Sequence, residues 1–315
     1  MTAQDYTSFN NVDNVGETLL MSQLESNLKT YFDWSFLGIG AFSNATIPTS
    51  GAYGGTYDRL RAVDDPSYTD GQVWESARKD WVWETGVERG TGEQPVDISG
   101  IYIGGTLYAT GDATFGHHYN YPLGRVVLDT AIATTSTVQV EHSYRNVQVY
   151  IADQAPWWDE LQYNSHRVED STFHHIGSGN WQILGNHRVQ MPAVVIEAVP
   201  RRQFKPYQQG SVGQYVYQDV NFHIIAESRW WRNQLIDILS LQQDRTIWLY
   251  DNNSIPFSLD HRGMRSTDPT PYPYLVDDYR WKMARIYKTL VTEMESHNSR
   301  LHQGTVRVTF EVIIA

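Results

Sequence analysis

The chain has 315 residues, with 36 Asp and Glu against 24 Lys and Arg, which gives a formal net charge of −12 and a pI near 5.3. This charge argues against a domain that grips nucleic acid through its phosphates, because such domains are usually basic. The absence of Cys excludes disulfides and thiolate catalysis, while 41% hydrophobic residues, with 11 Trp and 20 Tyr, suffice for a sizeable core and for aromatic interfaces.

The N-terminal region predicts one helix. Leu20, Leu24 and Leu28 lie four apart, which favours a helix over Glu17 to Phe32. The segment from Trp34 to Phe42 is apolar and punctuated by Gly, which predicts a strand or a buried turn. The sequence predicts no signal peptide, because no basic and apolar leader follows Met1, and no membrane span, because no apolar run is long enough.

Two polar segments are too long to be ordinary connections. Ser43 to Asp70 and Asn252 to Asp278 are rich in Pro, Asp and other turn-forming residues, and long loops of this kind usually have a function. We interpret both as extended arms that contact neighbouring subunits, because Tyr and Phe supply interface area at small entropic cost. The aromatic residues predicted at subunit interfaces are Tyr53, Tyr57 and Tyr68 in the first arm, Phe257, Tyr272 and Tyr274 in the second, and Trp157 and Trp158, which follow Pro156 and are expected at the surface.

A β-rich region follows the first arm. Ile98 to Tyr108 reads as a hairpin around Gly104-Gly105, and short β-branched runs continue at Arg125–Leu128, Thr137–Tyr144 and Asn146–Ile151. Turn residues separate these runs. Residues 95–153 therefore predict an inserted antiparallel sheet or sandwich.

The segment from Ala193 to Asp251 carries the strongest pattern. Two β-branched runs precede Arg229–Gln243, where apolar residues recur at helical spacing, and Thr246–Tyr250 returns to a strand. We expect this helix to bury Leu235, Ile238 and Leu239 on a sheet. The order of elements predicts an α+β fold with a helix-on-sheet core.

The C-terminal part predicts a helix over Asp278–Met294, with apolar residues three and four apart, and a final strand over Thr305–Ile314. The predicted division has three parts. Residues 1–94 hold the N-terminal helix and an arm and belong to the α+β core, residues 95–153 form the insert, and residues 154–315 complete the core, with the long loop at 252–278.

No residue pattern predicts catalysis. The pairs His117-His118 and His174-His175 place adjacent side chains on opposite sides of a strand, which favours surface or interface histidines over metal ligands. Asp64-Asp65 and Asp277-Asp278 could supply paired acids for glycoside hydrolysis, but their Pro and turn neighbours favour turn roles. We expect no enzyme activity, no metal and no cofactor, because no nucleophile motif or phosphate-binding loop is present.

One small basic cluster follows Pro200. Arg201, Arg202 and Lys205 could bind phosphate, but in so acidic a chain the cluster favours a salt-bridged rim.

Several segments resemble structural proteins of tailed-bacteriophage virions. Leu24 to Gly40 (LESNLKTYFDWSFLGIG) and Tyr121 to Ile132 (YPLGRVVLDTAI) are similar to segments of such proteins, and the element order over Val216–Tyr250 resembles the tail-terminator and neck fold. The resemblance implies a homo-oligomeric ring, a hexamer or dodecamer, that joins head and tail in the virion after assembly in the host cytoplasm. It also implies that the ring contacts neck, tail-tube or sheath proteins and that genomic DNA passes through it without sequence-specific binding. No contact with a membrane is expected.

Three functions therefore stand as hypotheses. The first is a ring-forming neck or tail-terminator protein. The second is a fibre, baseplate or receptor-binding component whose aromatic residues contact glycans, and the third is a glycan-active enzyme. Ring symmetry in electron micrographs would favour the first, trimers with glycan binding the second, and turnover the third.

Overall fold

The computed structural model describes residues 20–47, 58–89, 92–155, 157–158, 161, 174–176, 181–184, 187–208, 213–266, 270–298 and 300–314. The chain forms two compact units. Unit 1 comprises residues 1–31, 149–255 and 275–315, and unit 2 comprises residues 32–148 and 256–274. This division differs from the predicted one, because residues 32–94 cluster with the predicted insert instead of with the core. None of the described helices is long and apolar enough to cross a membrane.

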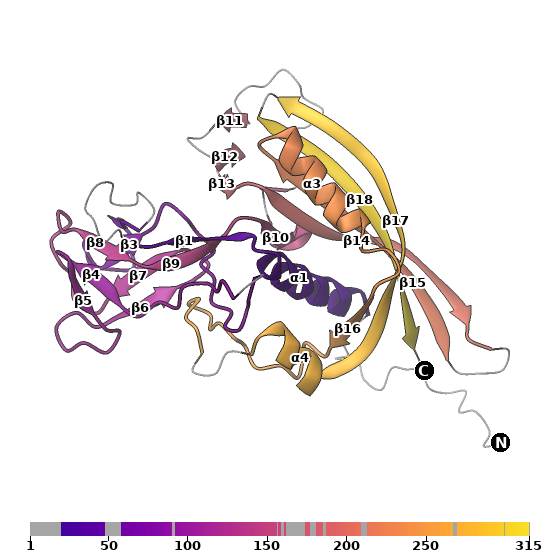
Figure 1. The fold of residues 1–315 in the computed structure, drawn as a ribbon, viewed down its shortest axis with the longest axis horizontal. Helices are drawn as coiled ribbons and strands as arrows, with labels where there is room; N and C mark the ends of the chain where they lie inside the picture. The colour runs from indigo at the N-terminus through magenta and orange to yellow at the C-terminus, as the bar shows by residue number, and fades with distance from the viewer. Residues whose placement is uncertain are drawn as a thin grey trace. The chain divides into compact units, whose positions relative to one another are not determined.

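Unit 1 is built on a curled sheet of six strands (Figure 1). The strands, in spatial order, are β10 (Gln148–Ile151), β14 (Ala193–Pro206), β15 (Gln214–Ala226), β18 (Leu301–Ile314), β17 (Arg280–Asn298) and β16 (Thr246–Tyr250). Of the residues that the structure describes, 42% are in strands and 18% in helices, and the six-stranded sheet is a half-barrel. The predicted α+β fold with a tail-terminator core is therefore wrong. A separate three-stranded sheet contains β11 (His174–Ile176), β12 (Trp181–Leu184) and β13 (His187–Gln190).

Helix α3 (Arg229–Ser240) packs against β15, β17 and β18 on the concave side of the sheet (Figure 1). Its first turn is capped by the hydroxyl of Ser228, which accepts a 3.2 Å hydrogen bond from the Trp231 amide. Leu235 and Leu239 are buried, as the sequence predicts, whereas the predicted Ile238 is only half-buried. Besides these two leucines, the helix buries Arg232 and Ile236.

Helix α1 (Leu20–Gly38) lies beside the free edge of β16. The side chain of Asn27 accepts a hydrogen bond from the Tyr250 amide at 2.8 Å and donates one to the Tyr250 carbonyl at 3.0 Å. These bonds satisfy backbone groups that an edge strand would otherwise leave unpaired. The helix continues through Trp34 to Gly38, so the predicted strand or turn there is wrong.

Strand β17 occupies the segment that the sequence predicts as a helix at 278–294, and that prediction is wrong. The strand pairs with β18 along most of its length, and its register shifts between Ile286 and Lys288 and between Val291 and Glu293. Each shift inserts an unpaired residue and exchanges the two faces of the strand. The apolar residues therefore lose strict alternation and imitate a helical spacing.

Unit 2 contains short strands in small sheets. One sheet has the order β2 (Arg61–Ala62), β3 (Val73–Glu75), β7 (Arg125–Leu128) and β6 (His117–Asn120), and another the order β5 (Thr106–Tyr108), β4 (Ile101–Ile103) and β8 (Val138–Val140). A two-stranded sheet pairs β1 (Phe42–Ala45) with β9 (His142–Arg145). The hairpin predicted around Gly104-Gly105 is confirmed, and both glycines have positive φ, as a two-residue primed turn requires.

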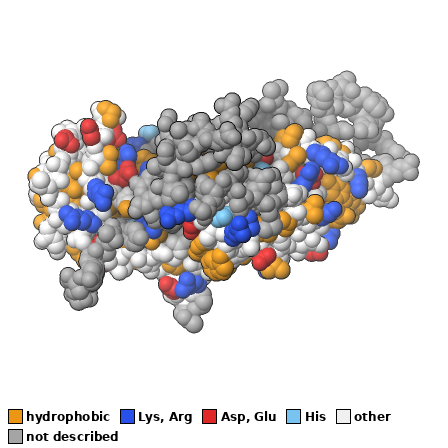
Figure 2. Space-filling view, turned by 90° about the horizontal axis from the view of Figure 1, so that it is seen from above, with side chains coloured by type: hydrophobic (Ala, Val, Ile, Leu, Met, Phe, Trp, Pro, Cys, Tyr) orange, Lys and Arg blue, Asp and Glu red, His pale blue; other side chains and the backbone are white. Residues whose placement is uncertain are grey.

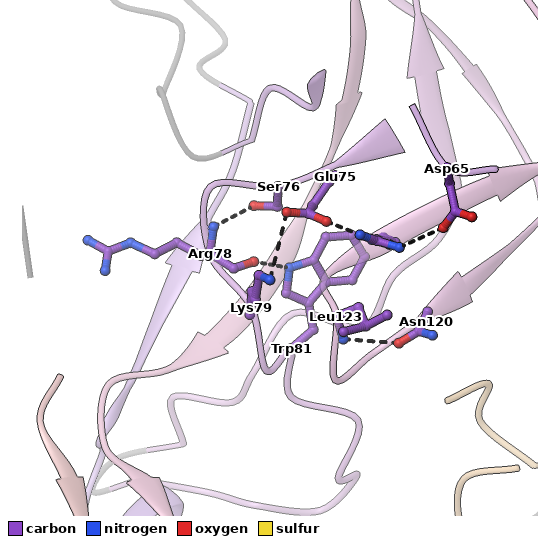
Figure 3. A network of polar contacts seen from close by, with 9 residues as sticks. Asp65, Glu75, Ser76, Arg78, Lys79, Trp81, Asn120 and Leu123 are labelled. Atoms are coloured by element: carbon purple, nitrogen blue, oxygen red, sulfur yellow. Dashed lines mark hydrogen bonds and ion pairs between the residues drawn. The ribbon is translucent and has the colours of Figure 1, made fainter. Parts of the chain in front are cut away.

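Ion pairs connect distant segments within unit 2. Arg125 lies between Asp65, at 3.1 Å, and Glu75, at 2.6 Å (Figure 3). The guanidinium of Arg145 is buried and binds Asp33 at 2.8 Å and the carboxylate of Glu84. Burial raises the pKa of Glu84 more than the nearby Arg145 lowers it, whereas the carboxylates of Asp33 and Glu84 keep Arg145 protonated. Because the two groups are in direct contact and the charge of each compensates that of the other, Glu84 and Arg145 form an ionised pair.

Part of the predicted second arm belongs to the body of unit 2. The amide of Tyr121 donates a 3.0 Å hydrogen bond to the Gly263 carbonyl, and Arg265 forms an ion pair with Asp97 at 3.1 Å. Helix α4 (Tyr272–Asp278) follows this segment. The loop at 252–278 is therefore anchored within its own subunit at these points.

Candidate interface site

The face of the six-stranded sheet opposite α3 carries half-exposed and exposed polar side chains among the described residues. Gly304 of β18 lies against α3, because a Cβ there would come within 2.6 Å of the Ile236 side chain. Strand side chains alternate between faces, so Val306, Val308 and Phe310 face the helix side, where they are buried. Arg307, Thr309 and Glu311 therefore lie on the opposite face, which we call the outer face.

The outer face holds a groove of about 320 Å³. Its lining residues come from four adjacent strands: Arg201, Gln203, Lys205, Tyr217, Asp219, Tyr287, Lys288, Leu290, Arg307 and Thr309. Four of these side chains are cations and one is a carboxylate. Figure 2 shows Lys and Arg side chains beside hydrophobic ones on the surface towards its right-hand end. The groove is thus strongly cationic, although the whole chain is acidic.

The single carboxylate of the groove is already bound. Asp219 accepts a 2.5 Å bond from Arg307 and a 2.7 Å hydrogen bond from the Thr309 hydroxyl. Burial alone would raise the pKa of Asp219, but these hydrogen bonds and the Arg307 charge outweigh it, and the pKa is lowered. Asp219 is consequently ionised near neutral pH and fixes the Arg307 side chain within the groove.

Two tyrosines form the centre of the groove. The rings of Tyr217 and Tyr287 meet edge to face with centroids 5.4 Å apart, and the Lys205 ammonium lies 4.8 Å from the Tyr217 centroid. A hydrogen bond to the Glu311 carboxylate, with burial as a smaller cause, raises the pKa of Tyr217 to about 12. The phenol therefore remains a neutral donor, and the lysine lies against an aromatic face.

A second concavity of about 450 Å³ lies at the start of β17 and the end of β18, beside β16. Its lining residues are Trp248, Arg280, Trp281, Lys282, Met283 and Ile313. The Arg280 guanidinium lies 4.0 Å from the Trp248 centroid, and the Lys282 ammonium lies 4.8 Å from the Trp281 centroid. Cations paired with aromatic rings are thus a feature of both concavities.

Three cations of the groove form no ion pair among the residues that the structure describes, although the charge of Arg201 contributes to the lowered pKa of Asp219. Arg201, Lys205 and Lys288 are exposed and form no ion pair with a described carboxylate. Arg202, on the other side of β14, donates to the Gln218 side chain at 2.9 Å instead. The salt-bridged rim predicted for Arg201, Arg202 and Lys205 is therefore absent from the described part of the chain.

The predicted interface aromatics lie in different environments. Trp157 and Trp158 are buried in a core cluster with Met191 and Leu301, which contradicts the predicted surface position. Phe257 and Tyr274 are 83% and 61% exposed, and Tyr68 is 41% exposed. Tyr272 is half-buried in α4, while Tyr53 and Tyr57 lie outside the described residues. None of these residues lines either outer-face concavity.

The histidine and aspartate pairs show no catalytic arrangement in the described residues. His117 is buried and contacts the Phe115 carbonyl at 2.8 Å and the Tyr119 hydroxyl at 2.9 Å. Asp65 is used in the Arg125 ion pair. No group of three or more His, Cys, Asp or Glu side chains that could hold a metal occurs within the described part of the chain.

No protein-family model matches the chain, and no curated protein matches its sequence.

Sequence reasoning missed the outer face, although a signal is present. Tyr215, Tyr217 and Asp219 recur at every second position of one strand, as do Arg307, Thr309 and Glu311 of another. This alternation of Tyr and charged residues marks the second, exposed face of each strand.

Proposed function

We propose that the protein is a ring-forming structural component of a tailed-phage virion and that the outer face of its sheet contacts the next subunit. The observation that carries this proposal is a cationic, aromatic groove on a chain whose net charge is −12. Such a surface attracts acidic surfaces, and the other parts of an identical chain supply them. Unit 2 alone has fourteen Asp and Glu against seven Lys and Arg within residues 32–148.

The positive charge of the groove determines whether it meets an identical groove or a different surface of the neighbouring copy. A two-fold axis through the groove would place cations opposite cations, which is unfavourable. The groove therefore pairs with a different surface of a neighbouring copy. Contacts between two different surfaces repeat around an axis and form a closed ring when the rotation closes.

The composition of the face also supports a protein interface. Tyr, Trp and Arg are enriched at interface positions that contribute most to affinity. Tyr217, Tyr287 and Trp248 supply aromatic area here, beside Arg201 and Arg307. No group of side chains that could hold a metal accompanies them in the described residues, so a contact surface is the simplest function for this arrangement.

The place in the virion rests on the resemblance of Leu24–Gly40 and Tyr121–Ile132 to phage structural proteins. We propose the head-to-tail connection, where a hexameric or dodecameric ring would adjoin neck, tail-tube or sheath proteins and surround the passing genomic DNA. An acidic chain suits this position, because net negative charge limits phosphate binding and lets DNA slide.

Light scattering and negative-stain imaging of the purified protein test the proposal. We expect a particle of several times 36.2 kDa with six-fold or twelve-fold symmetry. Replacing Arg201, Lys205 and Lys288 by Ala should weaken association while changing the free energy of unfolding by less than about 0.5 kcal/mol, because all three side chains are exposed.

The matched control replaces three exposed cations elsewhere, Arg59, Arg61 and Arg245, by Ala, which makes the same change in net charge. Association of the control should match the wild type. A wild-type chain that remains monomeric at all concentrations would refute the ring, and equal association of the groove variant would remove the outer face from the interface.

A further inference from the structure

The groove combines exposed cations with a pair of aromatic rings, and this combination restricts the chemistry of what it can bind. Arg201, Lys205 and Lys288 need acidic partners, and the Tyr217–Tyr287 pair offers an apolar ring edge between them. A segment with separated carboxylates and aromatic side chains matches both properties. Nucleobases match less well, because Lys205 already lies against the Tyr217 ring and Arg285 lies 5.8 Å from the Tyr287 centroid.

The chain contains such a segment before α1. Residues 1–19 carry the carboxylates of Asp5, Asp13 and Glu17, contain no Lys or Arg, and include the aromatic residues Tyr6 and Phe9. A stretch of 19 residues can reach at most roughly 65 Å when fully extended. This length allows the segment to extend well beyond its own helix, as a contact with another copy requires.

We propose that the outer-face groove binds the acidic segment of residues 1–19 from a neighbouring copy. This inference rests on the proposed ring and deepens it by naming the segment that the groove receives. Carboxylates of the segment pair with Arg201, Lys205 and Lys288, and an aromatic side chain contacts the tyrosine pair. Helix α1 lies on the same side of its own sheet as α3 (Figure 1), whereas the groove lies on the opposite face.

Charge exchange between full-length chains tests the contact. One variant carries Arg201→Glu and Lys288→Glu, which makes the groove acidic, and a second carries Asp5→Lys, Asp13→Lys and Glu17→Lys, which makes the segment basic. Each variant alone should show an assembled fraction at least about tenfold lower than the wild type, because like charges then meet at every contact. An equimolar mixture should recover assembly, since each groove then meets a segment of opposite charge on the other variant.

Circular dichroism and thermal unfolding of each variant serve as folding controls, and the two groove side chains are exposed. The assembly recovered by mixing should also weaken as salt approaches about 1 M, where the screening length falls to roughly 3 Å.

The outcomes separate this inference from the proposed ring. Wild-type assembly together with unchanged assembly of the segment variant would overturn the inference and leave the ring intact. If the mixture does not assemble but a variant that carries all five changes in one chain does, the groove binds the segment of its own chain. That result would overturn the proposed contact between copies. A monomeric wild type would instead refute the ring itself.

Discussion

The two units use their charged side chains in different ways. Unit 2 has short strands, and two of its arginines form ion pairs within the unit, Arg145 with Asp33 and Glu84 and Arg125 with Asp65 and Glu75. Unit 1 has long paired strands and an apolar helix interface, and it leaves cations on its outer face. The difference suggests that charge holds unit 2 together, whereas in unit 1 charge is available to a partner.

The largest expected effect comes from Arg145 in unit 2. Arg145→Ala leaves the buried Glu84 without its cation, and breaking a buried pair in this way costs roughly 3–5 kcal/mol of unfolding free energy. Urea unfolding followed by circular dichroism measures the loss. Arg89→Ala is the matched control, because its pair with Glu93 is exposed and should contribute less than about 1 kcal/mol. Similar losses for the two variants would show that buried charge does not hold unit 2 together.

The corresponding test for unit 1 concerns apolar packing. Leu239 is 1% exposed on the buried side of α3, so Leu239→Ala should cost roughly 2–5 kcal/mol, as for other buried leucine truncations. Leu241, just beyond the helix, is 78% exposed, and Leu241→Ala should cost less than about 0.5 kcal/mol. Thermal and urea unfolding compare the two. A loss below about 0.5 kcal/mol for Leu239→Ala would contradict the packing of α3 on the sheet.

The third test measures how the stability of unit 2 depends on pH. Burial lowers the pKa of His142 in unit 2 from 6.5 to about 4, and its Nε2 has no hydrogen-bond partner in the described residues. The unfolded state therefore binds a proton between pH 6.5 and 4 that the folded state does not, so stability is full above pH 6.5 and falls as the pH decreases. The loss amounts to about 3 kcal/mol at roughly 1.4 kcal/mol per pKa unit.

The pH profile of His142→Asn measures this contribution. Asn can keep the donor to the Val140 carbonyl, which lies 3.1 Å from Nδ1, without titrating. The slope between pH 6.5 and 4 should become shallower, although burial also lowers the pKa of His117 and some slope remains. His261→Asn, which replaces an exposed histidine, is the matched control. An unaltered slope in His142→Asn would show that this histidine is not the acid-sensitive group.

Sequence alone determined the elements whose signals are local. The α3 pattern, the hairpin at Gly104-Gly105 and the strands on either side of residue 210 need only neighbouring residues to specify them. The same holds for the net charge and the absence of Cys, which exclude whole classes of chemistry.

Tertiary structure alone decided β17 and the outer face. The segment 280–298 became a strand because pairing with β18 outweighs its helical spacing, and its bulges account for that spacing. The groove depends on the same pairing, since it brings residues near positions 201, 217, 287 and 307 together on adjacent strands. Register between strands that are distant in the chain depends on the packing of the whole sheet, and no local pattern encodes it.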